Sequence, residues 1–221
     1  MATRIRSTFD SELNAIHMNF THMGELVRTA IGLSMQALKD QDLVLAANVI
    51  ADDTTINDLR YNIEEACLTL IATQQPIAGD LRAIIAIMHS AVEMERMGDH
   101  AAGIAKTVIK SGDERPLKPG KKLSQMAELS QAMLTDCIEA FITHDAKRAS
   151  EIAARDTEMD QLYKVLFDRL IKVMGEHPKL IPRATYLMWC GHNLERIADR
   201  VTNLAEQIVF MTTGQMKELG S

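Results

Sequence analysis

The sequence predicts an all-α protein built as two tandem three-helix bundles that are related by an internal repeat. Its composition favours helices over sheets, with only five prolines, eleven glycines and 4% aromatic residues. Apolar residues recur three and four positions apart through long segments, as on one face of a helix. An acidic pattern also occurs twice, about 100 residues apart, and such a repeat indicates duplication of a structural unit.

Three helices are predicted in the first half, over residues 9–38, 42–73 and 76–110. Asp42 is a suitable N-cap for the second helix, because its side chain can accept a hydrogen bond from a free backbone N–H. Pro76 marks the start of the third helix, since proline is tolerated at a helix start and disfavoured inside one. Each helix is amphipathic and therefore has to pack one face against its neighbours.

Three further helices are predicted over residues 121–143, 145–174 and 178–213. The segment between the two sets is rich in proline and glycine, which is typical of a linker. The predicted domains are therefore residues 1–112 and 121–221, joined by a linker at 113–120.

The acidic positions of the two copies can be matched one by one. Those of the first copy are Asp53, Asn57, Glu95 and Asp99. Their counterparts in the second copy are Asp156, Asp160, Glu195 and Asp199, followed one turn later by Asn203. Within each copy these positions form pairs four residues apart, so each pair shares one helix face. We take these nine residues as the candidate metal ligands.

Asp53 and Asp156 each interrupt the apolar stripe of their helix. An aspartate in that place costs free energy unless it is paired, hydrogen-bonded or bound to a metal. If the second and third helices of each bundle are antiparallel neighbours, the acidic residues of each copy meet, and a cation would relieve their repulsion. Donors that are all oxygen favour Mg, Mn, Ca or Fe over zinc or copper.

Ion pairing is the alternative that the sequence leaves open. Basic residues lie next to the acidic positions at Arg96, Arg196 and Arg200, and they could neutralise some of the carboxylates. The first copy also offers fewer ligands than the second, because Asn57 replaces Asp160 and Gly103 replaces Asn203.

Several classes of function are disfavoured. A net charge of -6 and a pI near 5.6 argue against a nucleic-acid partner. No histidine has a glutamate three positions before it, and phosphate-binding loops and hydrolase motifs are missing, so we expect no enzyme. The N-terminus lacks an apolar signal segment, and a cytoplasmic protein is expected. A metal-dependent helical-bundle enzyme and a metal-free helical adaptor remain as alternatives.

Three motifs are distinctive enough to suggest a family. They are Ile71-Ala-Thr-Gln-Gln-Pro76-Ile-Ala-Gly-Asp80-Leu-Arg82, Glu95-Arg-Met-Gly-Asp99-His100 and Leu194-Glu-Arg-Ile-Ala-Asp199-Arg200. Together they resemble the PhoU family of phosphate-transport regulators, over about residues 9–213. Ala198 and Gly103 depart from the family pattern, which usually has glycine and asparagine at these positions.

The resemblance implies two three-helix bundles with metal clusters on their acidic motifs. It also implies a peripheral cytoplasmic regulator that damps the phosphate-starvation response. The expected partners are the ATPase of the phosphate ABC transporter, the phosphate-sensing histidine kinase and a second copy of the chain as a homodimer.

Overall fold

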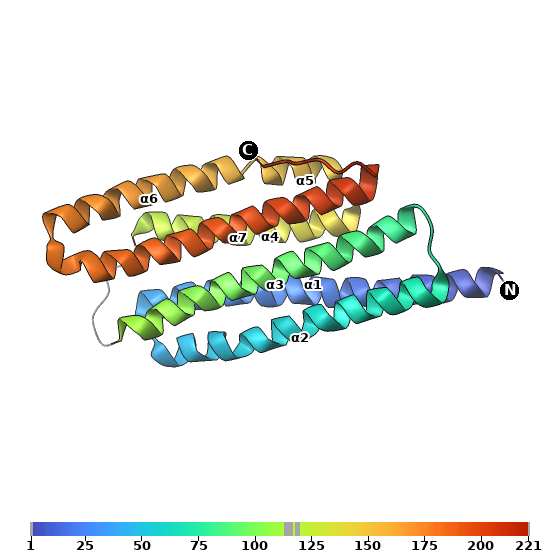
Figure 1. The fold of residues 1–221 in the computed structure, drawn as a ribbon, viewed down its shortest axis with the longest axis horizontal. Helices are drawn as coiled ribbons and strands as arrows, with labels where there is room; N and C mark the ends of the chain where they lie inside the picture. Colours follow the sequence, from blue (N-terminus) through green and yellow to red (C-terminus); the bar gives the residue numbers. More distant parts are fainter. Residues whose placement is uncertain (1, 113–116, 118–119, 221) are drawn as a thin grey trace.

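The computed structural model describes residues 2–112, 117 and 120–220, and every regular element in this part of the chain is helical (Figure 1). The elements are α1 (Ala2–Asp40), α2 (Leu43–Gln74), α3 (Gly79–Ser111), α4 (Lys121–Thr143), α5 (Ala146–Ala153), α6 (Asp156–Glu176), the 3-10 helix η1 (Pro178–Leu180) and α7 (Ile181–Thr213). The all-α prediction is confirmed. The first helix begins seven residues earlier than predicted, and most of the predicted linker lies outside the described residues.

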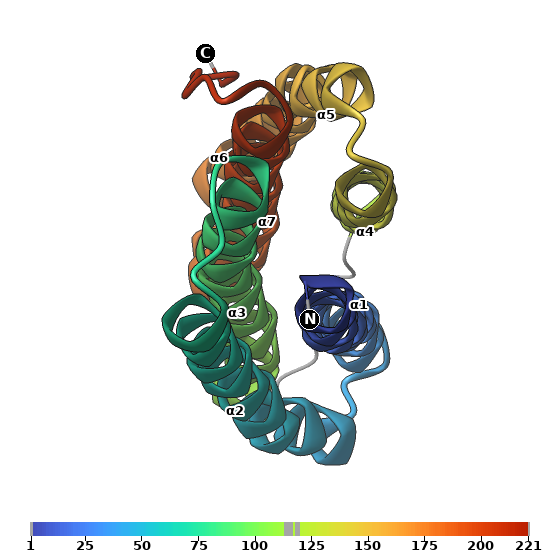
Figure 2. The same ribbon diagram turned by 90° about the vertical axis from the view of Figure 1, so that its right-hand side faces the viewer.

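The helices form two bundles that share one core. Helices α1, α2 and α3 make up the first bundle, and α4 to α7 make up the second (Figure 1). Seen end-on, α2, α3, α7 and α6 follow one another along one wall, while α1 and α4 lie on the other (Figure 2). Helices α3 and α7 are antiparallel and make the most extensive contact between any two described helices. The buried apolar side chains consequently form a single continuous cluster across both halves.

The two halves begin their second helices with the same turn. Asp42 accepts a hydrogen bond from the backbone N–H of Leu45 at 2.9 Å, as predicted for an N-cap. Asp145, its counterpart in the second half, does the same for Arg148 at 2.9 Å. These caps fix where α2 and α5 begin, and hence which residues face the neighbouring helix.

The single helix predicted over residues 145–174 is wrong, because the chain breaks between α5 and α6 at Ala154 and Arg155. Asp136 of α4 accepts hydrogen bonds from Arg148 at 2.9 Å and from Arg155 at 2.6 Å. One carboxylate therefore ties α5 and the break to α4. At the three equivalent positions the first half carries Leu33, Leu45 and Asp52. This ion-pair cluster is absent there, and α2 continues unbroken. The break makes Asp156 the first residue of α6.

No helix in the described ranges is both long enough and apolar enough to cross a membrane.

Candidate metal centre

The second acidic cluster, which we define as Asp156, Asp160, Glu195 and Asp199, lies where α6 packs along α7. Burial raises the pKa of Asp156 to about 6, and the charges of Asp199 and Asp160 add to the shift. Burial and the charge of Asp199 likewise raise the pKa of Glu195. Burial also raises the pKa of Asp199, although Arg196 opposes this. The fold therefore brings the predicted carboxylates close enough to repel one another.

The first acidic cluster, which we define as Asp53, Asn57, Glu95 and Asp99, lies between α2 and α3. Burial and then the charge of Asp99 raise the pKa of Asp53, and Lys106 opposes the shift. The same two causes raise the pKa of Glu95. Each half of the repeat thus brings its own acidic positions together, as the antiparallel packing of its helices predicts.

Several oxygen atoms of these clusters are buried and without a hydrogen bond. Among the described residues, no partner is found for Asp53 Oδ1, Asn57 Oδ1, Asp156 Oδ1 and Glu195 Oε2. A buried acceptor left unsatisfied costs about 1–3 kcal/mol, so these atoms need a ligand or a water. Carboxylate and amide oxygens are the donors that hard cations prefer. The residues therefore offer the type of donor atom that a hard cation prefers, and several of these donors have no other partner.

In neither cluster do the side chains converge closely enough to coordinate one ion. Within the described residues, no group of three or more His, Cys, Asp or Glu side chains is close enough to hold one ion. Binding would thus require the carboxylates to move inward. The unbonded oxygens of Asp53, Asn57, Asp156 and Glu195 would be the atoms free to turn toward an ion.

Ion pairs account for only part of the second cluster. Arg196 of α7 pairs with Asp199 at 2.8 Å. Nδ1 of His192 lies 3.3 Å from Oε2 of Glu195, without hydrogen-bond geometry. Asp156 Oδ1 is left unpaired. The ion-pair alternative therefore explains the environment of Asp199 but not that of Asp156.

Gly98 is a feature of the first cluster that the motif alone did not explain. A Cβ atom added at Gly98 would lie 3.2 Å from Asp53 Oδ1 and 3.1 Å from Cδ1 of Ile56. Glycine thus lets the aspartate approach the backbone of α3. Ala198 is the counterpart in the second half and is fully buried, so the second cluster tolerates a methyl group there.

Asn203 lies outside the second acidic cluster, in the polar contact between the two halves. Its Nδ2 donates a hydrogen bond to Glu93 Oε2 of α3 at 2.9 Å, and Arg200 approaches the same oxygen at 3.3 Å. In the related half, Nδ1 of His100 lies 3.1 Å from Oδ1 of Asn193. We define the α3–α7 seam as the set of Glu93, His100, Gly103, Asn193, Arg200 and Asn203. The role of Asn203 as a metal ligand remains a prediction, and the seam was missed because local sequence does not show which helices of different bundles meet.

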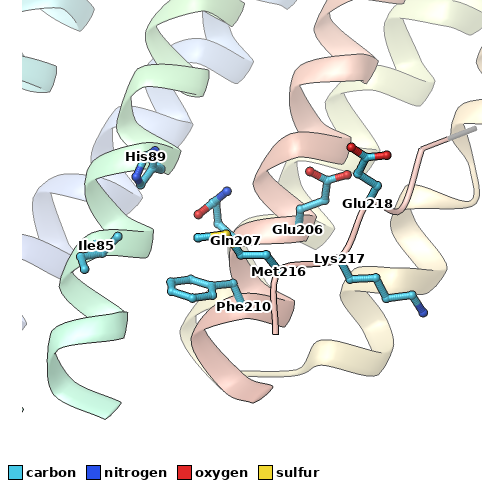
Figure 3. Close-up of a pocket in the computed structure, with 8 residues that line it drawn as sticks. All are labelled: Ile85, His89, Glu206, Gln207, Phe210, Met216, Lys217 and Glu218. Carbon is cyan, nitrogen blue, oxygen red and sulfur yellow. The ribbon is translucent and has the colours of Figure 1, made fainter. Parts of the chain in front are cut away.

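A groove of about 420 Å³ lies apart from both clusters, between α3, the end of α7 and the C-terminal tail (Figure 3). Ile85 and His89 line it from α3, and Phe210 lines it from α7. The tail is held beside the groove, since the backbone N–H of Leu219 donates to Glu206 at 2.9 Å. None of the cluster residues lines this groove.

Comparison with known proteins gives one consistent family. Residues 20–108 and 123–208 each match the PhoU domain. A Streptococcus pneumoniae serotype 4 protein named "Phosphate-specific transport system accessory protein PhoU homolog" is 39% identical over 97% of this chain and 100% of that protein. A protein of Rhizobium meliloti with the same name is 38% identical over 95% of this chain and 89% of its own length.

Solved structures with similar folds carry the same family name. The crystal structure of the phosphate transport system regulatory protein PhoU from Streptococcus pneumoniae superposes with a TM-score of 0.88 at 36% identity, covering 95% of this chain and 99% of that one. The crystal structure of PhoU from Pseudomonas aeruginosa gives a TM-score of 0.89 at 32% identity, covering 94% of this chain and 100% of that one. The similarity spans both bundles.

Proposed function

This chain belongs to the PhoU family, and we propose that it is a negative regulator of phosphate uptake and of the phosphate-starvation response that acts by binding rather than by catalysis. The observation that carries the proposal is the similarity along nearly the whole chain to proteins named as accessory to phosphate-specific transport. A fold made of two related bundles offers extended helical faces for binding.

The proposed partners are the ATPase of a phosphate ABC transporter and a phosphate-sensing histidine kinase. Both would meet this protein on the cytoplasmic side of the membrane, so it would be a peripheral protein held through its partners. A homodimer is proposed as its working form.

We further propose that each acidic cluster binds a divalent or trivalent cation, with Mg, Mn or Fe the best suited to oxygen donors. Asp53, Asn57, Glu95 and Asp99 would hold it in the first half. Asp156, Asp160, Glu195 and Asp199 would hold it in the second half. Support comes from the unpaired buried oxygens and from the raised pKa values of the carboxyl groups. A bound cation would supply positive charge that cancels the repulsion in each cluster.

Deletion of the gene tests the regulatory proposal. We expect the strain to keep phosphate uptake but to express starvation genes even in abundant phosphate, and the wild-type gene to restore repression. Unchanged repression in the deletion strain would contradict the proposal. Metal analysis of the purified protein, beside the Asp156→Asn/Asp199→Asn variant, tests the cation separately, because the variant should lose metal from the second cluster only.

A further inference from the structure

The break between α5 and α6 lies directly before Asp156 of the second acidic cluster. Helices α5 and α6 follow one another along α7, whereas their counterpart α2 runs along α3 as one helix (Figure 1). At the break the backbone N–H of Arg155 donates to the carbonyl of Ile152 at 3.0 Å, and that of Glu158 donates to the carbonyl of Arg155 at 2.9 Å. Both bonds span three residues, as in a 3-10 helix, rather than four. The helical turn is therefore tighter here than in the α-helices on either side.

This tightening rotates Asp156 about the helix axis. A 3-10 step turns the chain by about 20° more per residue than an α-helical step does. Since Cα atoms lie about 2.3 Å from the helix axis, one such step moves a Cα atom by about 0.8 Å. The same number of residues separates the N-cap from the aspartate in both halves, from Asp42 to Asp53 and from Asp145 to Asp156. The break therefore shifts Asp156 relative to α7 without inserting a residue.

The carboxylate of Asp136 on α4 holds the break. Its Oδ2 accepts a hydrogen bond from Arg155 at 2.6 Å, and its Oδ1 accepts one from Arg148 of α5 at 2.9 Å. The side chains of Arg155 and Asp136 are 32% and 34% exposed, so water screens this pair less than it screens a fully exposed one. Because Arg155 directly precedes Asp156, the ion pair restrains the backbone from which that aspartate projects.

The first half places its aspartate without such a restraint. A Cβ atom at Gly98 would lie 3.2 Å from Asp53 Oδ1 and 3.3 Å from Cγ2 of Ile56. The absence of a side chain at position 98 therefore lets α2 and the carboxylate of Asp53 lie close against α3.

The second half has a methyl group at that place, because Ala198 is the counterpart of Gly98 and is fully buried. Met159 replaces Ile56 and has no branch at Cβ, which removes one of the two close contacts. The contact with the aspartate remains, so Asp156 has to lie a few tenths of an ångström farther from α7 than the geometry of the first half would place it. The shift of about 0.8 Å that one tightened step supplies is large enough for this.

We propose that Asp136 is a positioning residue for the second metal site. Through Arg155 it holds the break that sets Asp156 among the other carboxylates of the second cluster, past the methyl group of Ala198. Asp136 acts through Arg155 and is not itself a ligand. The inference rests on the proposed function, since it concerns how the chain prepares the cation site of its second half. Ligands that are held in place before binding lose less conformational freedom when the ion arrives.

Calorimetric titration with Mn²⁺ tests the role of Asp136. An Asp53→Asn/Asp99→Asn background isolates the second site, and there Asp136→Leu should weaken Mn²⁺ binding by about tenfold, since outer residues that orient metal ligands typically change affinity about 10- to 100-fold. In an Asp156→Asn/Asp199→Asn background the same substitution should leave the first site unchanged. Circular dichroism and thermal melting verify folding. Asp136→Asn, which keeps the size of the side chain and removes its charge, is the second variant should Asp136→Leu not fold.

A cycle with Ala198→Gly tests the mechanism. In the Ala198→Gly protein the aspartate can approach α7 as Asp53 approaches α3, so the break is no longer needed to clear the methyl group. Asp136→Leu should then weaken Mn²⁺ binding at the second site by less than about threefold, compared with about tenfold when Ala198 is present. A role of Asp136 in general stability would give the same loss in both proteins, because it does not depend on the methyl group.

Two further variants separate position from charge. Glu139→Gln is the matched control, because Glu139 also accepts a hydrogen bond from Arg148, at 2.8 Å, and makes no ion pair with Arg155. It removes one negative charge from α4 and should leave the affinity of the second site unchanged. Arg155→Gln breaks the ion pair from its other side and also removes a positive charge beside Asp156. It should weaken Mn²⁺ binding, although loss of the positive charge alone would strengthen it.

Four results would overturn the proposal. They are unchanged affinity in Asp136→Leu, an equal loss in Glu139→Gln, an equal loss with and without Ala198, and tighter binding in Arg155→Gln. Each of them would leave the cation site of the proposed function standing, because Mn²⁺ would still bind to the second cluster of the otherwise unaltered protein. Absence of Mn²⁺ binding in the Asp53→Asn/Asp99→Asn protein itself would instead remove that cation site, and the positioning role with it.

Discussion

Asn203 of α7 donates a hydrogen bond to Glu93 of α3 across the contact between the two halves. In the repeat, Asn193 of α7 is equivalent to Glu93 of α3, and Gly103 of α3 is equivalent to Asn203 of α7. There the side chain of Asn193 lies where a side chain at 103 would project, since a Cβ atom at Gly103 would be 2.9 Å from Asn193 Oδ1. The glycine that departs from the family pattern is therefore explained by the packing of the seam.

Building a second Glu–Asn pair at positions 193 and 103 of the seam should require both substitutions together. Gly103→Asn alone should destabilise the protein by roughly 1–3 kcal/mol, because the new side chain overlaps Asn193. Adding Asn193→Glu should recover most of the loss, since it rebuilds the Glu93 and Asn203 pair in the other half. Urea unfolding of the two single variants and the double variant measures this coupling. A neutral Gly103→Asn, or a double variant no better than the sum of the singles, would show that the seam does not couple these positions.

Much of this architecture could be predicted because its signals are local. The caps at Asp42 and Asp145 are examples, since an N-cap bonds to a residue three positions away. The meeting of acidic residues within each half also followed from the repeat and from antiparallel packing. The break between α5 and α6 could not be predicted, because no glycine or proline marks it. It depends on Asp136, which lies 19 residues before Arg155 and on another helix.

The stability of the metal-free protein should fall as the pH rises through about 6. The pKa of Asp156 is raised by burial and by Asp199 and Asp160, from an ordinary value of 3.8 to about 6 in the fold. The folded state consequently holds a proton that the unfolded state has released, and the stability gained in this way is complete below about pH 4 and is lost above pH 6. Burial also raises the pKa values of Glu195 and Asp199, so the Asp156 contribution is isolated by comparison with Asp156→Asn.

Asp156→Asn should be more stable than the wild-type protein at pH 7 without metal, and this advantage should shrink toward pH 4. Urea unfolding in a chelator at several pH values measures the difference. Asp168→Asn, an exposed aspartate on the same helix, is the control and should show little effect. An advantage that stays constant across this pH range would indicate that the aspartate is not held in its protonated form by the cluster.

Gly98→Ala tests how closely Asp53 has to approach α3. The added methyl group would lie 3.2 Å from Asp53 Oδ1, so the carboxylate has to shift by a few tenths of an ångström. We expect metal binding at the first cluster to weaken while the second cluster is unaffected, and the gain in helix propensity of up to about 1 kcal/mol should offset much of the cost to folding. Calorimetric titration with Mn²⁺ in an Asp156→Asn/Asp199→Asn background isolates the first site. Unchanged affinity there would mean that Asp53 is not a ligand.

Cation binding should reverse the effect of removing the acidic residues. A ligand that binds only the folded state adds about 2.7 kcal/mol of stability at a hundredfold excess over its dissociation constant. Added Mn²⁺ should therefore raise the melting temperature of the wild-type protein more than that of Asp156→Asn/Asp199→Asn, although without metal the variant should be at least as stable. As metal is added, the melting temperature of the wild-type protein should therefore rise from at or below that of the variant to above it. Strong destabilisation of the metal-free variant would instead identify these aspartates as ion-pair partners of residues such as Arg196, because the loss of a stabilising pair needs no cation to be seen.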